Sequence, residues 1–509
     1  MDSYTKNRNT ASENLKSVYF IVLLGAVVLY AATCAPGPLW QDSGIFQYRI
    51  VHNDIEGKLG LALSHPLFHI IGIAVKQIPI GELAFRVNLI SAIAGAITIA
   101  NLFLLLRLWL DKITPAAVAA LTLALSHTFW RHSVIAESYT LYTALLSAEL
   151  LMLLQYLRTK RIKFLYLLGL LNGLAIANHM WGIIALCCYT VFLAGLLIKK
   201  QIRLRHLGII LLMWIIGAAP YEYLIIKNII ETGSLSGTFA SVFFGNAWQG
   251  EVLNVSLSAR LVKENLILIA YNFPTPNILL FAAGFWGLKK LSQSRTFRNI
   301  ILALLILFFV FAFRYTVPDR YAFFIPFYFL ASILIGVGFN LIAVRLQKPF
   351  LLYLIFLLAL LPIPTYLAAP HIAEKINFNL SAKRQIPYRN NYTWFLCPWK
   401  TSYHGPKLFA EAAFETTEEN AAIFADSTTA PPLLYLQDVK KKRTDVDIIS
   451  TVAAKQSPVN LTERNMKKLL AERPFYVVSP VSGYCPSFLL EQYHFVPEGT
   501  IWRVVEKTE

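Results

Sequence analysis

Two acidic residues lie at positions where a carboxylate could take part in chemistry. Asp42 follows the first long apolar segment, within the polar stretch 40–44, and Glu137 lies between apolar residues in the stretch 135–139. A carboxylate beside a wall of apolar helices can be oriented and partly desolvated, as the acids and bases of active sites are. The alternative for Asp42 is a solvated loop residue beside a turn glycine. For Glu137 that alternative is weaker, because a carboxylate at the edge of a membrane helix is costly without a partner or a water-filled cavity.

Basic and imidazole side chains near the same helix ends are candidates for binding an anion. The basic residues nearest to the predicted outer helix ends are Arg131, Arg314 and Arg320. A guanidinium binds phosphate through two parallel hydrogen bonds, whereas snorkelling or contact with lipid headgroups is the alternative for each arginine. The histidines that could bind phosphate or carry a proton are His65, His69 and His179. His65 and His69 have the spacing of one helix face, but no acid adjoins them there, so the pattern is only a weak indication of a metal site.

The elements that must position these residues are helices in a membrane. The chain has 509 residues, of which 56% are hydrophobic and only 15% are charged, far from the usage of soluble proteins. Apolar runs recur to about residue 369, and the longer ones approach the ~20 residues that cross a bilayer as a helix. No alternating pattern typical of a porin appears, so the predicted spans are helices.

The distribution of charge predicts the topology. The formal net charge of +17 does not indicate a nucleic-acid partner, because the basic residues form short clusters between apolar runs. Such clusters mark the cytoplasmic side of a membrane. Two crossings between successive clusters predict about 11 transmembrane helices over residues 1–369, with the N-terminus inside and residues 370–509 outside. The first apolar segment is interpreted as a retained helix and not as a cleaved signal peptide.

Local patterns add detail to the membrane part. Residues 66–76 are apolar but too short to span, which predicts an interfacial or re-entrant helix. Pro274 and Pro276 predict a kink or a break in the helix expected over 264–288. A single helix is expected over 113–130.

The last quarter of the chain has a different pattern. Its strand-like segments are 421–425, 446–448 and 475–479, and a helical segment covers 461–470. This alternation predicts a small α/β domain. The predicted fold class is therefore an all-α polytopic membrane domain followed by a small α/β extracytoplasmic domain. Cys397 and Cys485 are the cysteines of the outer part, and they either form a disulfide across an oxidising compartment or remain two buried thiols.

Four blocks of sequence, taken together, resemble the protein O-mannosyltransferase-like family of multi-pass proteins, which belongs to the GT-C glycosyltransferase superfamily. The blocks are Trp40-Gln41-Asp42-Ser43-Gly44 with His65-Pro66; Ser126-His127-Thr128-Phe129-Trp130 with Ile135-Ala136-Glu137-Ser138-Tyr139-Thr140-Leu141; Gly173-Leu174-Ala175 with Asn178-His179; and Tyr315-Thr316-Val317-Pro318-Asp319-Arg320 with Phe323-Phe324-Ile325-Pro326. The resemblance touches most of the chain in order. Ile45 stands where the family often has a second acidic residue.

The resemblance implies transfer of a sugar, with mannose as one candidate, from a polyprenyl-phosphate carrier to an acceptor hydroxyl on the outer face of the membrane. Asp42 would be the general base of an inverting displacement, and Glu137 would shape or assist the site. The residues assigned to substrate binding are His65, Arg131, His179, Asp319 and Arg320. No residue is assigned as a metal ligand, and a requirement for a divalent cation stays open.

The expected partners are the lipid-linked sugar donor and an acceptor that is a protein, a lipid or a glycan. The expected location is a bacterial inner membrane, with the active site and the C-terminal domain facing the periplasm or exterior. A transporter or lipid flippase is the alternative function, although such a protein would carry ionisable groups near the middle of its helices and most of those here lie at outer helix ends. A receptor that uses the membrane part only as an anchor would not need so many helices.

Overall fold

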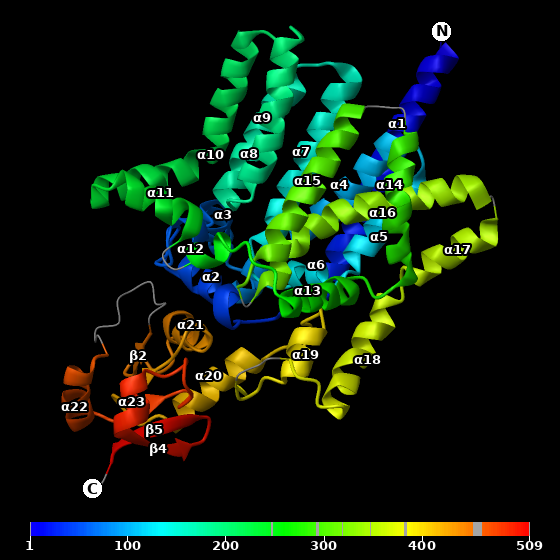
Figure 1. The fold of residues 1–509 in the computed structure, drawn as a ribbon. Coiled ribbons are helices and arrows are strands. Elements are labelled where there is room, and N and C mark those ends of the chain that lie inside the picture. Colours follow the sequence, from blue (N-terminus) through cyan, green and yellow to red (C-terminus); the bar gives the residue numbers. More distant parts are fainter. Residues whose placement is uncertain are drawn as a thin grey trace.

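The computed structural model describes residues 2–507 apart from 246–247, 292–294, 318, 347, 381–383 and 451–460. Most of the chain forms a bundle of long helices, and the last part forms a smaller α/β body next to one end of the bundle (Figure 1). The bundle helices are α1 (Asp2–Ala32), α4 (Leu83–Leu110), α5 (Ile113–Ala124), α7 (Tyr139–Thr159), α8 (Lys163–Asn178), α9 (Gly182–Ile198), α10 (Leu204–Thr232), α14 (Leu279–Lys290), α15 (Arg295–Arg314), α16 (Ile325–Leu346), α17 (Pro349–Leu358) and α18 (Pro362–Lys375). This arrangement confirms the predicted fold class.

The helix lengths fit an integral, multi-pass membrane protein. Within the described residues, seven helices are long and apolar enough to cross a membrane, or nine if each of two bent helix pairs is one crossing. Two further apolar helices, α8 with 16 residues and α9 with 17, are shorter. At 1.5 Å per residue they reach about 24 to 26 Å, against a hydrocarbon core of about 30 Å. The 11 predicted crossings require both of these helices to cross as well.

Two of the predicted helices are bent. The expected helix over 264–288 is broken by 112° between α13 (Ala259–Asn272) and the segment that begins at Pro276, which confirms the predicted effect of the prolines. The prediction of one straight helix over 113–130 is wrong, because α5 ends at Ala124 and a 70° bend leads into α6 (His127–Ser133). Ser126 has an extended backbone at this bend. The bend turns α6 across the end of the bundle that faces the α/β body.

Two glycines bring α8 and α10 into close contact. A Cβ atom added to Gly173 would lie 2.2 Å from the carbonyl oxygen of Trp214, and one added to Gly217 would lie 2.3 Å from that of Leu170. Small residues at such crossings let membrane helices pack backbone to backbone. The contact fixes the end of α8, where the chain turns at residues 178–181 towards α9.

Short helices cover the end of the bundle next to the α/β body. They are α2 (Gln41–Val51), α3 (Pro66–Lys76), α11 (Leu235–Phe244) and α12 (Gln249–Val252), with the 3-10 turns η1 (Leu61–Leu63) and η3 (Arg320–Phe324). The helix predicted over residues 66–76 is present with these bounds. α2 is held to α4 by Gln47, whose side-chain amide donates to the Asn88 side chain at 2.9 Å and whose oxygen accepts from the Leu39 backbone at 3.0 Å.

The α/β body contains a five-stranded sheet in the order β2-β1-β3-β5-β4. The strands are β1 (Ala422–Phe424), β2 (Asp447–Ile449), β3 (Phe475–Val477), β4 (Tyr493–Glu498) and β5 (Ile501–Glu506). β1 pairs in parallel with β2 and β3, whereas β5 pairs antiparallel with β3 and β4. The first three strands match the predicted segments, and the β4–β5 hairpin was not predicted. The helices of this part are α19 (Asn391–Leu396), α20 (Gly405–Thr416), α21 (Ala430–Lys440), α22 (Glu463–Glu472) and α23 (Ser487–Gln492).

The two cysteines of this part are not bridged, so the disulfide is a wrong prediction. Both thiols are free and buried. The Cys397 thiol lies 3.6 Å from the carbonyl oxygen of Tyr366, near the bundle. Cys485 packs instead in the core between the sheet and α22 and α23.

The α/β body and the bundle share one hydrophobic core. Leu39 and Trp40, just before α2, and Tyr48, within it, pack with residues of α20, α21 and the sheet. Polar contacts follow the same surface: the Trp40 indole donates to the Tyr403 hydroxyl at 2.7 Å, and the His52 imidazole lies 2.7 Å from the Asp438 carboxylate. The α/β body therefore holds α2 from the side opposite to the bundle.

Candidate active site

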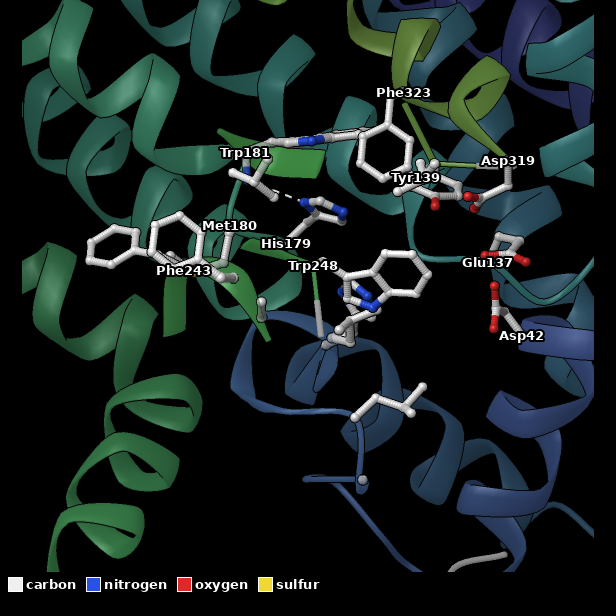
Figure 2. A pocket seen from close by; sticks show the side chains of 18 of the residues that line it. Asp42, Glu137, Tyr139, His179, Met180, Trp181, Phe243, Trp248, Asp319 and Phe323 are labelled. Carbon is white, nitrogen blue, oxygen red and sulfur yellow. Dashed lines mark hydrogen bonds between the residues drawn. The ribbon is translucent and has the colours of Figure 1, made fainter. Parts of the chain in front are cut away.

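A cavity of about 380 Å³ lies at the end of the bundle that faces the α/β body. Its walls come from α2, the loop after it, the α8–α9 turn, the α11–α12 segment and the chain around residues 311–323. Carboxyl groups gather at one end, with Asp42, Glu137 and Asp319, whereas Met180 and Phe243 lie at the other (Figure 2). The other apolar lining residues include Ile183, Ile184, Phe244, Trp248, Val252 and Phe311. One cavity thus has an acidic end and an apolar arm.

The three carboxyl groups come from three distant parts of the chain. Asp42 lies in the first turn of α2, Glu137 precedes α7, and Asp319 precedes η3. The carboxyl groups of Asp42 and Glu137 point towards each other, and that of Asp319 lies beside them (Figure 2). Pro318, which belongs to the same sequence block as Asp319, lies outside the described residues.

Glu137 is the most firmly held of the three. Its carboxylate accepts a hydrogen bond from the Ser43 hydroxyl at 2.8 Å. Its backbone N–H donates to the Ser91 hydroxyl at 3.0 Å, and that hydroxyl donates to the Glu137 carbonyl oxygen at 2.9 Å. Only 9% of Glu137 is exposed, whereas Asp42 is open to the cavity. Glu137 therefore has a fixed position, and Asp42 is the carboxyl group that a bound molecule reaches.

The electrostatics separate the roles of the three groups. Burial by the surrounding protein raises the pKa of Asp42. Burial and, next, the charge of Asp42 raise the pKa of Asp319 to about 7 and that of Glu137 well above its usual value. Carboxyl groups that share one site cannot all ionise at neutral pH. The charge of Asp42 therefore favours the protonated form of Glu137.

The arginines assigned from the sequence do not line this cavity. Arg131 is buried beside α19: it donates to the carbonyl oxygen of Trp394 and lies over the Trp394 ring, with its guanidinium carbon 4.7 Å from the ring centroid. Arg320 pairs with Glu264 and donates to the Asn265 side chain at 3.1 Å. Each guanidinium is already engaged within the protein.

Two basic residues that were not assigned from the sequence do line the cavity, Arg49 and Lys58. Arg49 is 5% exposed and donates to the carbonyl oxygen of Ser64 at 2.9 Å, and its Nε lies 3.6 Å from the Asp54 carboxylate. Gly57, with φ of +73°, packs so closely that an added Cβ would lie 2.9 Å from the guanidinium carbon. Arg49 thereby orders the loop that carries Lys58 to the cavity. Asp42 and Arg49 are seven residues apart, two turns of one helix, which is the sequence signal that could have revealed Arg49.

The assigned histidines line the cavity as neutral rings. The His65 imidazole lies 2.8 Å from the carbonyl oxygen of Asn178, and its ring centroid is 4.9 Å from that of His179. Burial lowers the pKa of His65 to about 4 and that of His179 well below its usual value. At neutral pH both rings therefore act as hydrogen-bonding groups and not as cations. His69 is buried and does not line the cavity.

A metal site is not built by this part of the structure. Within the described ranges, no group of three or more histidine, cysteine, aspartate or glutamate side chains is placed to hold a metal ion. The site offers instead three carboxyl groups, two neutral imidazole rings and two cations beside an apolar arm. Such a set suits an acceptor hydroxyl and an amphipathic donor that meet near Asp42.

Comparison with known proteins finds a family model and a relative that each match part of the chain. Residues 62–202 match the family model described as the N-terminal domain of protein O-mannosyl-transferase TMEM260. The protein of that name from Mus musculus is 26% identical over 174 residues, which are 33% of this chain and 25% of the mouse protein. The match thus spans about a quarter of the length of that relative. The segment that the family model matches, residues 62–202, contains His65, Glu137 and His179, whereas Asp42 and Asp319 lie outside it.

Solved structures show the same fold over nearly the whole chain. Two crystal structures of ArnT from Cupriavidus metallidurans, one bound to undecaprenyl phosphate and one in the apo state, each match with a TM-score of 0.60. They are 14% identical in sequence, and the match covers 97% of this chain and 98% of ArnT. The likeness is therefore one of fold.

Proposed function

We propose, from the premise that this chain is a GT-C-fold relative of the protein O-mannosyl-transferases, that it transfers a sugar from a polyprenyl-phosphate carrier to an acceptor hydroxyl. The observation that carries the proposal is the single cavity in which three carboxyl groups at one end adjoin an apolar arm at the other. A lipid-linked sugar has these two halves, a polar head and a hydrocarbon tail. Mannose is the first sugar to test because of the matched family, and undecaprenyl phosphate is the first carrier because ArnT binds it.

The donor phosphate is assigned to the region of Arg49 and Lys58. These cations line the same cavity as Asp42, whereas Arg131 and Arg320 are engaged with Trp394 and Glu264 outside it. Positive charge near the phosphate stabilises the anion that leaves in the transition state. The prenyl tail then extends along the apolar arm, past Phe243 towards the surrounding lipid.

The reaction is a single displacement with Asp42 as general base. The ionised Asp42 carboxylate accepts the proton of the acceptor hydroxyl while the hydroxyl oxygen attacks C1 of the sugar. The bond between C1 and the phosphate oxygen breaks, and its electron pair leaves with the polyprenyl phosphate. Configuration at C1 is inverted. Glu137, protonated and fixed by Ser43 and Ser91, keeps a second negative charge away from the base and shapes its surroundings.

The site is placed on the outer side of the membrane. The basic clusters between the apolar runs support an inside location for the opposite helix ends, which puts the cavity and the α/β body on the periplasmic or exterior side of a bacterial inner membrane. The acceptor is a protein, lipid or glycan hydroxyl on that side. A divalent cation is left to the assay, which includes a chelator arm.

The test uses membranes that express the full chain and polyprenyl-phosphate donors labelled in the sugar. We expect label to pass to a macromolecule with wild-type protein and not with the Asp42→Asn variant, whose insertion is checked by its amount in the membrane fraction. Label that moves between leaflets of vesicles without being transferred would overturn the proposal in favour of a lipid flippase. Loss of transfer when a chelator is added would show that transfer requires a divalent cation.

A further inference from the structure

The Tyr139 hydroxyl is a polar group of the cavity that has no role in the proposed chemistry. Tyr139 begins α7, two residues after Glu137, and lines the cavity at its acidic end. It lies between Trp181 and the carboxyl groups (Figure 2). The phenol is within electrostatic range of Asp319, Glu137 and Asp42, and only 9% of the residue is exposed.

The Tyr139 ring is fixed on both sides. It stacks on the Trp181 indole with a centroid distance of 5.2 Å and an interplanar angle of 27°, and it meets the His132 ring edge-on at 5.2 Å. The Phe323 ring lies 6.1 Å away. A ring held in this way presents its hydroxyl in one direction, so a bound group pays little to order it.

The hydroxyl has no hydrogen-bond partner among the residues that the structure describes, although its ring is nearly buried. Its neighbour one turn along the helix differs: the Tyr142 hydroxyl donates to the carbonyl oxygen of Trp181 at 3.2 Å. The Tyr139 oxygen is not one of the fully enclosed polar atoms, so it reaches the cavity. A polar group that is held in a cavity wall without a protein partner is paired by water or by a ligand, and it marks a place where a ligand can supply the partner.

We infer that the Tyr139 hydroxyl binds a hydroxyl of the sugar of the donor, and this inference rests on the proposed function. The attacking oxygen must lie within hydrogen-bond reach of Asp42 and about 3 to 3.5 Å from C1 of the sugar. The ring of the sugar then occupies the space between Asp42 and the apolar arm, which is where Tyr139 stands. The tyrosine adds a hydroxyl donor to the carboxyl groups at this end of the cavity. Tyr139 therefore recognises the sugar and not the lipid.

The experiment compares two ligands on three forms of the full-length protein. The ligands are undecaprenyl phosphate and the undecaprenyl-phosphate sugar that the labelling experiment identifies, and the forms are wild type, Tyr139→Phe and Tyr142→Phe. Loss of one neutral hydrogen bond in Tyr139→Phe should weaken binding of the sugar donor by about 3- to 10-fold and leave undecaprenyl phosphate unchanged. Tyr142→Phe removes a more deeply buried hydroxyl from the same helix, one that is already bonded to the Trp181 carbonyl oxygen, and it should shift neither ligand selectively.

Donors that lack one sugar hydroxyl give an independent arm that needs no variant. One such deoxy donor should bind the wild type about 3- to 10-fold more weakly, and it should lose nothing further on Tyr139→Phe. The inference is overturned if every deoxy donor binds the wild type as well as the intact donor does. Equal selective loss in both tyrosine variants would also overturn it, since the position of the wall would then be the cause. Failure of the proposed function is a different result, in which wild-type protein transfers no sugar at all.

Discussion

The three carboxyl groups can be told apart by substitutions that keep their shape. Asp42→Asn removes the general base, and the rate of transfer should fall by at least about 100-fold, which is about 2.7 kcal/mol in activation free energy. Glu137→Gln should behave differently. Burial and the charge of Asp42 raise the pKa of Glu137, which favours its neutral form, and glutamine keeps the oxygen that accepts the Ser43 hydroxyl. What changes is one neutral hydrogen bond, so the loss should stay within about 10-fold.

The assay is the initial rate of sugar transfer at pH 7 from saturating lipid-linked donor, with purified variants matched for amount and for thermal unfolding. The decisive quantity is the ratio of the two losses. A Glu137→Gln variant that is as inactive as Asp42→Asn would show that Glu137 is charged in the working enzyme. Retention of more than a tenth of the activity by Asp42→Asn would refute its role as the base.

Three further substitutions test the surroundings of the base. Burial and the charge of Asp42 raise the pKa of Asp319 to about 7, so Asp319→Asn should remove from the kcat/KM profile any change near pH 7 while the acid limb set by Asp42 stays in place, and a shifted acid limb would show that Asp319 is charged when Asp42 ionises. Gly44→Ala places a Cβ 2.6 Å from the side chain of Pro431 in α21, and the overpacking should cost about 1 to 3 kcal/mol, seen as earlier thermal unfolding and as lower activity. Gly217→Val should separate α8 from α10 and lower thermal stability by a similar amount without moving the pH profile, which a fluorescence or light-scattering melt and a rate profile measure together.

The elements were predictable from the sequence because their signals are local. A run of apolar residues fixes where a membrane helix lies along the chain, and the short apolar stretch 66–76 was correctly expected as a separate helix. The strand-like segments at β1 to β3, which alternate with helical segments along the chain, gave an equally local signal. The β4–β5 hairpin was missed because the exposed positions of β4 and Pro497 within it weaken the alternation. The bend before α6 was missed because its polar stretch, Ser126 to Thr128, is short and apolar residues resume at Phe129.

The cavity was predictable only in part, because it depends on how distant segments meet. Depth along a helix places Asp42 and Glu137 near one level, and the structure brings them together. Depth along a helix does not give the direction in which a side chain points. Arg131 lies at the same level, but its side chain faces α19 and not the cavity. Arg49 and Tyr139 were missed in the opposite way: neither was assigned to the site from the sequence, and both line the cavity. Each lies in an ordinary amphipathic or aromatic context, and only the folded loop and the stacked rings show what they face.

The core that α2 shares with the α/β body limits how this protein can be re-engineered. The backbone N–H of Gln41, next to Asp42, donates to the carbonyl oxygen of Thr428 at 3.3 Å, and Trp40 packs at 5.3 Å from the Phe409 ring. The α/β body is thus not an independent module. A graft of this body from a relative requires the matching face of α2, and its removal exposes Trp40, close to Asp42. Conversely, a molecule that tilts the α/β body on binding pulls on the segment that carries Asp42. Binding at the α/β body and the position of the Asp42 carboxyl group therefore share one mechanical connection.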